Sequence, residues 1–246
     1  MTPDPEAARR FYGALLPWEL ETREVAGVSC TDIRVGGAPF GGIVPLDPAH
    51  GIPAHWMSYV QVDDLDATCA RTAAAGGTVC VPPQPIPGGT GRFAVLQDPT
   101  GAYVSLLQTA TPVAPPEPTA PPVPGSAWWH ELITPDPARA AAFYAAVLGW
   151  TADDGMTLPD GSRYRTFLAG ERPVGGLMAC PPGAPAVAAW QLYLALAEVA
   201  DVMPTVVRAQ RLGATVTWPV MDVPGVGRMG GLQDPTGAHV ALGAAE

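Results

Sequence analysis

The sequence predicts an α+β protein that contains two tandem copies of one folding unit with mixed sheets. Three observations support this class: a long internal repeat, a strand-helix-strand-strand order that occurs twice in each copy, and a proline-rich segment between the copies. Hydrophobic residues make up 48% of the 246-residue chain, which is enough apolar surface for a core. We therefore expect two folded domains and a linker.

The internal repeat is carried by short motifs that return in the same order. They pair Phe11-Tyr12 with Phe143-Tyr144, Gly41-Gly42 with Gly175-Gly176, Trp56 with Trp190, and Asp98-Pro99-Thr100-Gly101 with Asp234-Pro235-Thr236-Gly237. The offset grows from 132 (143 minus 11) to 136 (234 minus 98), which indicates short insertions in the second copy. Such ordered self-similarity is the mark of a tandem duplication.

The segment from Thr109 to Pro124 contains seven prolines. Proline has no backbone N–H and holds the chain extended, so this segment cannot join a sheet and acts as a linker. We place domain one at residues 1–110, the linker at 111–124 and domain two at 125–246.

Helices are predicted where an Asp-Pro pair opens an apolar run, because Asp caps the helix and Pro fits its first turn. These pairs are Asp4-Pro5 and Asp136-Pro137. A second, Ala-rich helix is expected in each copy, over 64–75 and 198–212, and glycine ends it.

Strands are predicted from apolar and β-branched runs bounded by turn residues. In copy one they span 28–35, 40–46, 57–62, 92–97 and 102–108, and in copy two they span 163–169, 174–180, 189–196, 227–233 and 238–243. Copy two also has a strand at Ala127–Thr134 before its first helix. Only three residues precede Asp4, so we expect one sheet edge of domain one to be open, or covered by the linker or a neighbouring chain.

The Phe-Tyr helix, the strand that begins with Trp, and the closing Asp-Pro-Thr-Gly hairpin together resemble the vicinal oxygen chelate superfamily, which includes glyoxalases, bleomycin-resistance proteins and extradiol dioxygenases. The resemblance covers both copies. It implies paired βαβββ modules in each domain, whose curved sheets form a partly open barrel around a small-molecule cleft. It also implies that the duplication supplies both halves within one chain, as a monomer with internal domain pairing, or a homodimer.

Metal-dependent members of this superfamily hold their ion at fixed strand positions. In copy two those positions fall on Trp129, Gln191 and Ala241, and in copy one on Met57 and Ser105. A divalent ion needs about three converging N or O donors, so we expect no metal and no cofactor. A one-residue shift of the first strand would turn His130 inward, which keeps metal binding as an alternative.

Side-chain alternation places a carboxylate, an imidazole and several aromatic groups along the cleft that the family fold implies. We expect Glu131 and His239 to act as a general acid/base pair. The alternative is that Glu131 only accepts hydrogen bonds and that His239 lies near a rim. The expected substrate-binding residues are Trp129, Gln191, Tyr193, Tyr59, Tyr103 and Ser105.

Composition limits the partners and the compartment. The net charge of −10 and the pI near 4.7 argue against nucleic-acid binding. No apolar run reaches the roughly 18 residues of a membrane span. The four cysteines form no C-x-x-C pair, which indicates reduced thiols in a cytoplasm.

Two functions remain open at this point. The first is a metal-independent enzyme that isomerises, cyclises or eliminates a hydrophobic, aromatic or polyketide-like metabolite by proton transfer. The second is a drug- or metabolite-binding protein that sequesters such a ligand without turnover. The inward polar groups favour the enzyme slightly.

Overall fold

The computed structural model describes residues 1–87, 89, 91–111, 122–158, 161–183 and 185–246. Strands dominate these residues, and the α-helices are α1 (Pro5–Leu15), α2 (Leu65–Ala74), α3 (Pro137–Leu148) and α4 (Val202–Arg211). Within the described ranges, no helix has both the length and the hydropathy of a membrane span. The predicted linker lies largely outside the described residues, since 112–121 are not among them.

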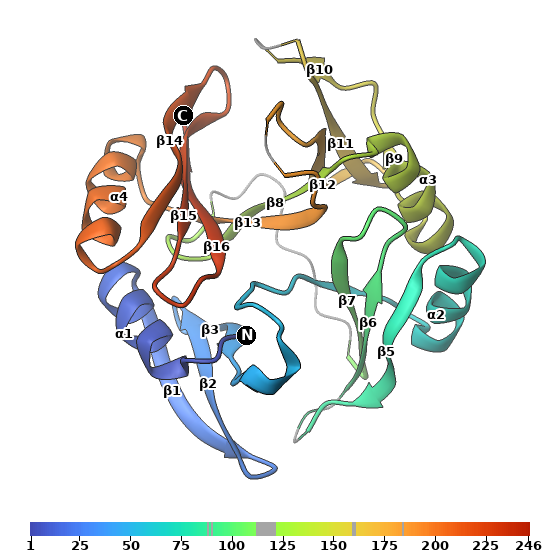
Figure 1. Cartoon of the computed structure of the whole chain (residues 1–246), viewed down its shortest axis with the longest axis horizontal. Coiled ribbons are helices and arrows are strands. Elements are labelled where there is room, and N and C mark those ends of the chain that lie inside the picture. The colour runs from blue at the N-terminus through green and yellow to red at the C-terminus, as the bar shows by residue number, and fades with distance from the viewer. Residues whose placement is uncertain (88, 90, 112–121, 159–160, 184) are drawn as a thin grey trace. The chain divides into compact units, whose positions relative to one another are not determined.

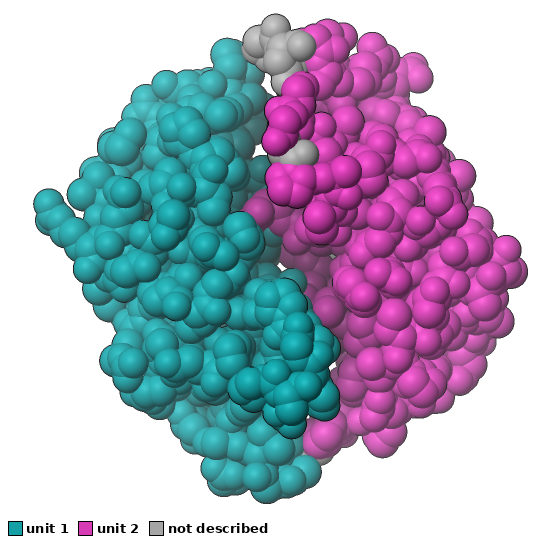
Figure 2. Space-filling view, in the orientation of Figure 1, with its two compact units in different colours: residues 1–56, 121–128, 192–246 teal, residues 57–120, 129–191 magenta. Residues whose placement is uncertain are grey.

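The chain divides into two compact units, and each unit combines parts of both copies (Figure 2). Unit 1 comprises Met1–Trp56, Pro121–Trp128 and Leu192–Glu246, and unit 2 comprises Met57–Ala120 and Trp129–Gln191. The boundaries 1–110 and 125–246 therefore describe the copies of the repeat, whereas compact packing joins the first half of one copy to the second half of the other.

Unit 1 contains one antiparallel and one mixed set of strands (Figure 1). The antiparallel sheet has the order β1 (Trp18–Val25), β2 (Val28–Val35) and β3 (Ala38–Ile43). In the mixed set, β16 (His239–Ala245) pairs in parallel with β13 (Ala189–Ala195) and antiparallel with β15 (Gly227–Gln233), and β14 (Thr215–Val223) follows β15. Residues of β13 from Leu192 onward belong to this unit.

Unit 2 contains two further sets of strands. One sheet has the order β4 (Tyr59–Gln61), β7 (Tyr103–Thr109), β6 (Gly91–Gln97) and β5 (Thr78–Pro85). In the other set, β12 (Arg172–Ala179) pairs in parallel with β8 (Ala127–Thr134) and antiparallel with β11 (Arg163–Ala169), and the short β9 (Thr151–Ala152) and β10 (Met156–Thr157) both pair with β11. Residues of β8 from Trp129 onward belong to this unit.

The α+β class with two equivalent halves is confirmed, and most predicted elements lie where expected. The sequence pattern does not predict β1, β5 or β14. All three lie at the edges of their sheets. β5 and β14 contain prolines, which edge strands tolerate, and β1 contains three glutamates, which are rare in strands that are buried on both faces.

Copy two opens with the full strand β8, whereas copy one shows one bridge at the equivalent place. In β8, Thr134 pairs in parallel with Ala179, and in copy one Thr2 makes the matching parallel bridge to Pro45. The described residues of copy one thus contain this single bridge where copy two has a strand, and β3 is the last strand of its sheet in unit 1.

Each unit has its own apolar core, in which a helix of one copy packs against strands of the other. In unit 1, Phe11 and Leu15 of α1 belong to a cluster with Leu194 and Leu242. In unit 2, Phe143 and Val147 of α3 belong to a cluster with Leu96, Val104 and Leu106. The amphipathic helices therefore bury their apolar faces across the repeat.

A buried polar hub in unit 2 connects the motifs that define the repeat. The hydroxyl of Tyr144 on α3 donates to Asp98 Oδ2 at 3.1 Å, and Trp190 Nε1 donates to the Tyr144 hydroxyl at 2.8 Å. Asp98 Oδ1 accepts three backbone N–H groups of the turn that follows it, at 2.7 to 3.1 Å. One carboxylate thus fixes both its own turn and the helix of the other copy.

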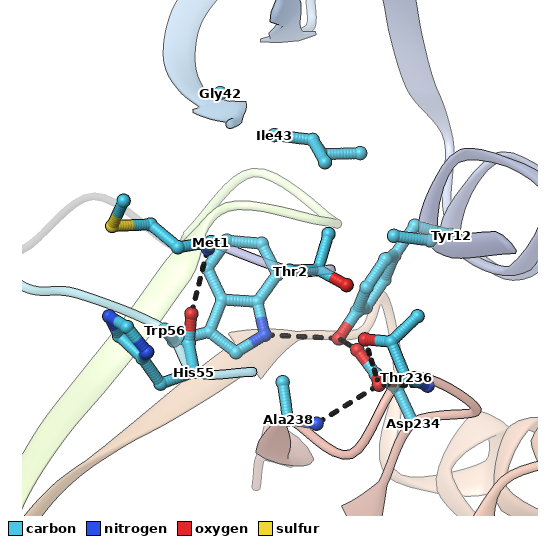
Figure 3. A pocket seen from close by; sticks show the side chains of 11 residues that line it. Met1, Thr2, Tyr12, Gly42, Ile43, His55, Trp56, Asp234, Thr236 and Ala238 are labelled. Carbon is cyan, nitrogen blue, oxygen red and sulfur yellow. Dashed lines mark hydrogen bonds between the residues drawn. The ribbon is translucent and has the colours of Figure 1, made fainter. Parts of the chain in front are cut away.

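Unit 1 contains the same hub with the copies exchanged (Figure 3). Tyr12 donates to Asp234 Oδ2 at 2.8 Å, and Trp56 Nε1 donates to the Tyr12 hydroxyl at 3.0 Å. Burial, followed by the nearby carboxylate, raises the pKa of both tyrosines far above the usual value, so both phenols stay protonated as donors. The Phe-Tyr, Trp and Asp-Pro-Thr-Gly motifs are repeated in the sequence because their Tyr, Trp and Asp side chains meet in these two hubs.

We expect Tyr144→Phe to lower the free energy of unfolding by about 2 to 4 kcal/mol, because it leaves Oδ2 of the buried Asp98 carboxylate and the Trp190 N–H each without a partner. Tyr12→Phe should cost a similar amount in unit 1. Tyr103→Phe, at a half-exposed position, is the matched control and should change stability by less than about 0.5 kcal/mol. Urea unfolding of the three variants measures this, and equal stability of Tyr144→Phe and the control would contradict the hub.

Candidate functional site

The small cavity of unit 1 lies at its hub and has room for water only (Figure 3). Its volume is about 20 Å³, which corresponds to one water molecule. The amino group of Met1 lines it and donates to the carbonyl of His55 at 2.8 Å, and burial lowers the pKa of that amine while the charge of Asp234 opposes the shift. An organic substrate does not fit here, so the site must be sought elsewhere.

Unit 2 brings together a carboxylate, a phenol and an indole on one face of its second sheet. Because side chains alternate along a strand, Trp129 and Glu131 of β8 share a face. Tyr164 of β11 meets them there: Trp129 Nε1 donates to the Tyr164 hydroxyl at 2.7 Å, and that hydroxyl in turn donates to Glu131. Glu131 is only 6% exposed. We call Trp129, Glu131 and Tyr164 the Glu131 cluster.

The cluster depends on a glycine in the strand between its members. Gly176 of β12 pairs with Glu131 in the parallel ladder. A Cβ atom at Gly176 would collide with the Tyr164 hydroxyl and would lie 3.0 Å from Trp129 Nε1. Glycine is therefore the residue that allows the phenol to lie flat against the sheet.

The electrostatics of the cluster assign the proton to Tyr164. Burial is the main cause that raises the pKa of the Tyr164 phenol, and the negative charge of Glu131 raises it further. The phenol thus remains a hydrogen-bond donor at every working pH. Glu131 is the acceptor of this hydrogen bond.

His130 lies on the opposite face of β8 from the Glu131 cluster. Its Nδ1 is 2.9 Å from Ser58 Oγ. Burial lowers the pKa of His130 to about 4, so the ring is neutral at pH 7. The register in which Trp129 and Glu131 share the site face agrees with the expected one, and His130 does not join them.

Three of the expected substrate-binding residues lie on β4 and β7 of unit 2. Tyr59 and Tyr103 are about half exposed, at 54% and 50%. Ser105 pairs with Tyr59 in the ladder and is fully buried, and within the described residues its Oγ makes no hydrogen bond of standard geometry. Burial raises the pKa of Tyr59, and the neighbouring Ser105 hydroxyl opposes the shift.

The expected partners Glu131 and His239 belong to different units. His239 lies on β16 of unit 1, is exposed to solvent and approaches Gln233 Nε2 at 3.4 Å, whereas Glu131 is buried in unit 2. Tyr193 is also in unit 1, buried and packed against Trp218 with 6.3 Å between the rings. The pairing of His239 with Glu131 therefore stays a prediction.

The remaining expected residue, Gln191, is half-buried on β13 at the end of unit 2.

The residue that sequence reasoning missed is Tyr164. Alternation along Arg163, Tyr164 and Arg165 already puts the phenol on the face away from the two arginines. The glycine pair 175–176 in the next strand was the further signal that a large side chain lies there.

The donor set does not fit the metal site that the superfamily resemblance implies. Within the part of the chain that the structure describes, no group of three or more His, Cys, Asp or Glu side chains could hold an ion. Trp129 stands at one of the ligand positions, and its N–H is a donor engaged by Tyr164 rather than a ligand.

We expect wild-type stability to fall more steeply than that of His130→Gln as the pH drops from 6.5 to 4. The unfolded histidine binds a proton near pH 6.5 and the folded one only near pH 4, so stability is lost as pH falls through this window. The extra loss should be about 2 kcal/mol, read from urea unfolding at pH 7.5 and 4.5. His239→Gln, at an exposed histidine, is the control and should follow the wild type; parallel curves for all three proteins would refute the assignment.

Comparison with known proteins gives the family and the fold. A model of the Glyoxalase/Bleomycin resistance protein/Dioxygenase superfamily matches residues 1–106 and 129–242. Anthracycline biosynthesis protein DauV of Streptomyces sp. (strain C5) is 36% identical over 262 residues, covering 98% of this chain and 89% of the relative. CFP32 of Mycobacterium tuberculosis, named as a candidate glyoxylase, is 36% identical over 242 residues, covering 96% and 89%.

Solved structures share the fold at low sequence identity. The 2,3-dioxygenase LapB from Pseudomonas sp. KL28 has a TM-score of 0.67 at 16% identity, covering 99% of this chain and 89% of that one. The Mn(II)-bound glyoxalase from Novosphingobium aromaticivorans has a TM-score of 0.64 at 17% identity, covering 99% and 79%. The matched ranges, the duplicated motifs and the shared fold agree: this chain belongs to the Glyoxalase/Bleomycin resistance protein/Dioxygenase superfamily.

Proposed function

We propose that this protein is an enzyme of secondary metabolism that acts by general acid/base chemistry, without a metal, on a hydrophobic polycyclic aromatic compound. The observation that carries the proposal is the Glu131 cluster, a buried carboxylate whose position is fixed by a phenol and an indole. The substrate class is supported by the relatives DauV and DnrV of Streptomyces, both named anthracycline biosynthesis proteins and both 36% identical over 98% of this chain.

Glu131 has the chemistry of a general base. In the proposed step, its carboxylate takes a proton from a carbon next to a carbonyl group of the substrate. The C–H bond breaks, its electron pair forms the C=C bond of an enolate, and the C=O π pair moves onto the oxygen. In an isomerisation the same proton is returned at another atom of the conjugated enolate. In a cyclisation the enolate carbon bonds to a second carbonyl carbon of the substrate, and the alkoxide formed there takes the proton. Tyr164 holds the carboxylate in place, and Trp129 holds Tyr164.

A second candidate is binding without turnover. It is favoured by the fact that Glu131 already accepts the Tyr164 hydroxyl, which is also what a purely structural carboxylate does. A ligand that stacks on aromatic side chains would then be sequestered unchanged.

We expect Glu131→Gln to reduce turnover of an anthracycline-type aromatic ketone by about 100- to 10,000-fold while leaving its binding within a few-fold of wild type. The amide preserves shape and can still accept from Tyr164, but it cannot take the proton. Turnover is followed by liquid chromatography with mass spectrometry, and binding by ligand fluorescence.

The control is Glu171→Gln, an exposed glutamate in the turn before β12, which should behave as wild type. Unchanged turnover in Glu131→Gln would remove the base from the proposal. Wild-type protein that binds the ketone tightly and returns it unmodified would favour sequestration instead.

A further inference from the structure

Two tryptophans occupy equivalent places in the two units but have different neighbours. Trp18 follows α1 in unit 1, and Trp150 follows α3 in unit 2 at the repeat offset of 132 (150 minus 18). Both rings stack on the tyrosine of their hub, with 5.0 Å between the centroids of Trp18 and Tyr12 and 5.7 Å between those of Trp150 and Tyr144. The difference lies on the other side of each indole.

In unit 1 the turn that leads into β8 fills the space beside Trp18. Trp18 Nε1 donates to the carbonyl of Gly125 at 2.8 Å. The Gly125 N–H donates to Ala195 O at 2.7 Å, and the Ala195 N–H donates to Ser126 O at 2.9 Å, so this turn is bonded to the end of β13. Gly125 has a φ of +89°, and a Cβ there would lie 3.0 Å from Trp18 Nε1, so only glycine fits this seat.

In unit 2 the equivalent space is a groove of about 350 Å³. Gln61 stands there at the position of Ala195, by the offset of 134 that also relates Trp56 to Trp190. The groove lies at α2 and the end of α3, which pack side by side (Figure 1). Trp150 lines it, and among the described residues its Nε1 makes no hydrogen bond of standard geometry. A tryptophan N–H in such a largely buried ring ordinarily has a partner.

The charge of the groove determines which peptides can bind there. Asp63 and Asp64 line it and are exposed. The one cation among its lining residues, Arg71, is held inward, since its Nε donates to Val147 O at 3.0 Å and a terminal nitrogen donates to Thr68 Oγ1 at 2.7 Å. The entrance of the groove is therefore acidic and complements a positive charge.

We infer that this groove of unit 2 is a binding site for a glycine-containing peptide turn that carries a positive charge. A peptide carbonyl accepts from Trp150 Nε1, as Gly125 does from Trp18. The glycine lies flat on the indole, and the cationic group lies beside Asp63. The Glu131 cluster is not part of this groove, so the inference does not depend on the proposed enzymatic function.

The test is a titration of the whole protein with the amidated peptide Arg-Val-Pro-Gly-Ser-Ala, which copies the Val123–Ala127 segment behind an added arginine. The indole N–H resonances of ¹⁵N-labelled protein are followed by NMR, and that of Trp150 is assigned by its loss in Trp150→Phe. We expect a saturable shift of the Trp150 resonance and no shift for Trp18, whose acceptor is already in place.

Three comparisons make the result specific. A peptide with Val in place of Gly should bind at least about tenfold more weakly, because a β-branched residue resists a positive φ and would clash with the ring. Asp63→Asn, at an exposed position that leaves folding intact, should weaken binding of the original peptide by about two- to fivefold. N-methylacetamide alone should not reproduce the Trp150 shift at the same concentration.

No movement of the Trp150 resonance at millimolar peptide would overturn the inference. So would equal binding of the glycine and valine peptides, or an unchanged affinity in Asp63→Asn. An equal response to N-methylacetamide would assign the groove to small amides rather than to a peptide. If Trp150→Phe does not fold, the comparison of wild type with Asp63→Asn still tests the inference. The peptide affinity of both proteins can be measured from any resonance that shifts on titration.

Discussion

A buried hydrogen bond from a tyrosine to an aspartate is the interaction on which the rest of this structure depends. In each unit it binds a helix of one copy to the closing turn of the other, and a tryptophan N–H completes it. A buried carboxylate is costly unless all of its lone pairs are used, and here the turn and the phenol use them. This requirement explains why these motifs stay alike in the two copies while much of the intervening sequence has diverged.

The hub of unit 2 and the Glu131 cluster are joined through two adjacent glycines on β12. A Cβ at Gly175 would lie 3.2 Å from the ring of hub residue Trp190, and one at Gly176 would collide with the Tyr164 hydroxyl. Gly175 thus makes room for the hub residue Trp190, and Gly176 makes room for Tyr164 of the Glu131 cluster. In copy one, Gly41 has nothing nearby and Gly42 faces only a backbone oxygen, so the glycines are repeated there without a comparable side chain to accommodate.

Much of the fold could be predicted from sequence because it rests on local signals: Asp-Pro caps, alternating strands and the repeat itself. The face shared by Trp129 and Glu131 followed from alternation alone. The crossed packing of the copies could not be predicted, since the hub residues are identical whichever copy supplies the helix. The exposure of His239 and the contact of Tyr164 with Glu131 depend on neighbouring strands far away in sequence, about which a periodic pattern carries no information.

The crossed packing also has a consequence for how the chain forms during synthesis. Unit 2 is drawn from the middle of the chain, Met57–Ala120 and Trp129–Gln191, so all of it leaves the ribosome before the last strands are made. Unit 1 joins Met1–Trp56 to Leu192–Glu246, which are made first and last. The apolar face of α1 therefore waits for its partner while residues 57–191 are made, and unit 1 depends on long-range contacts of the kind that slow folding.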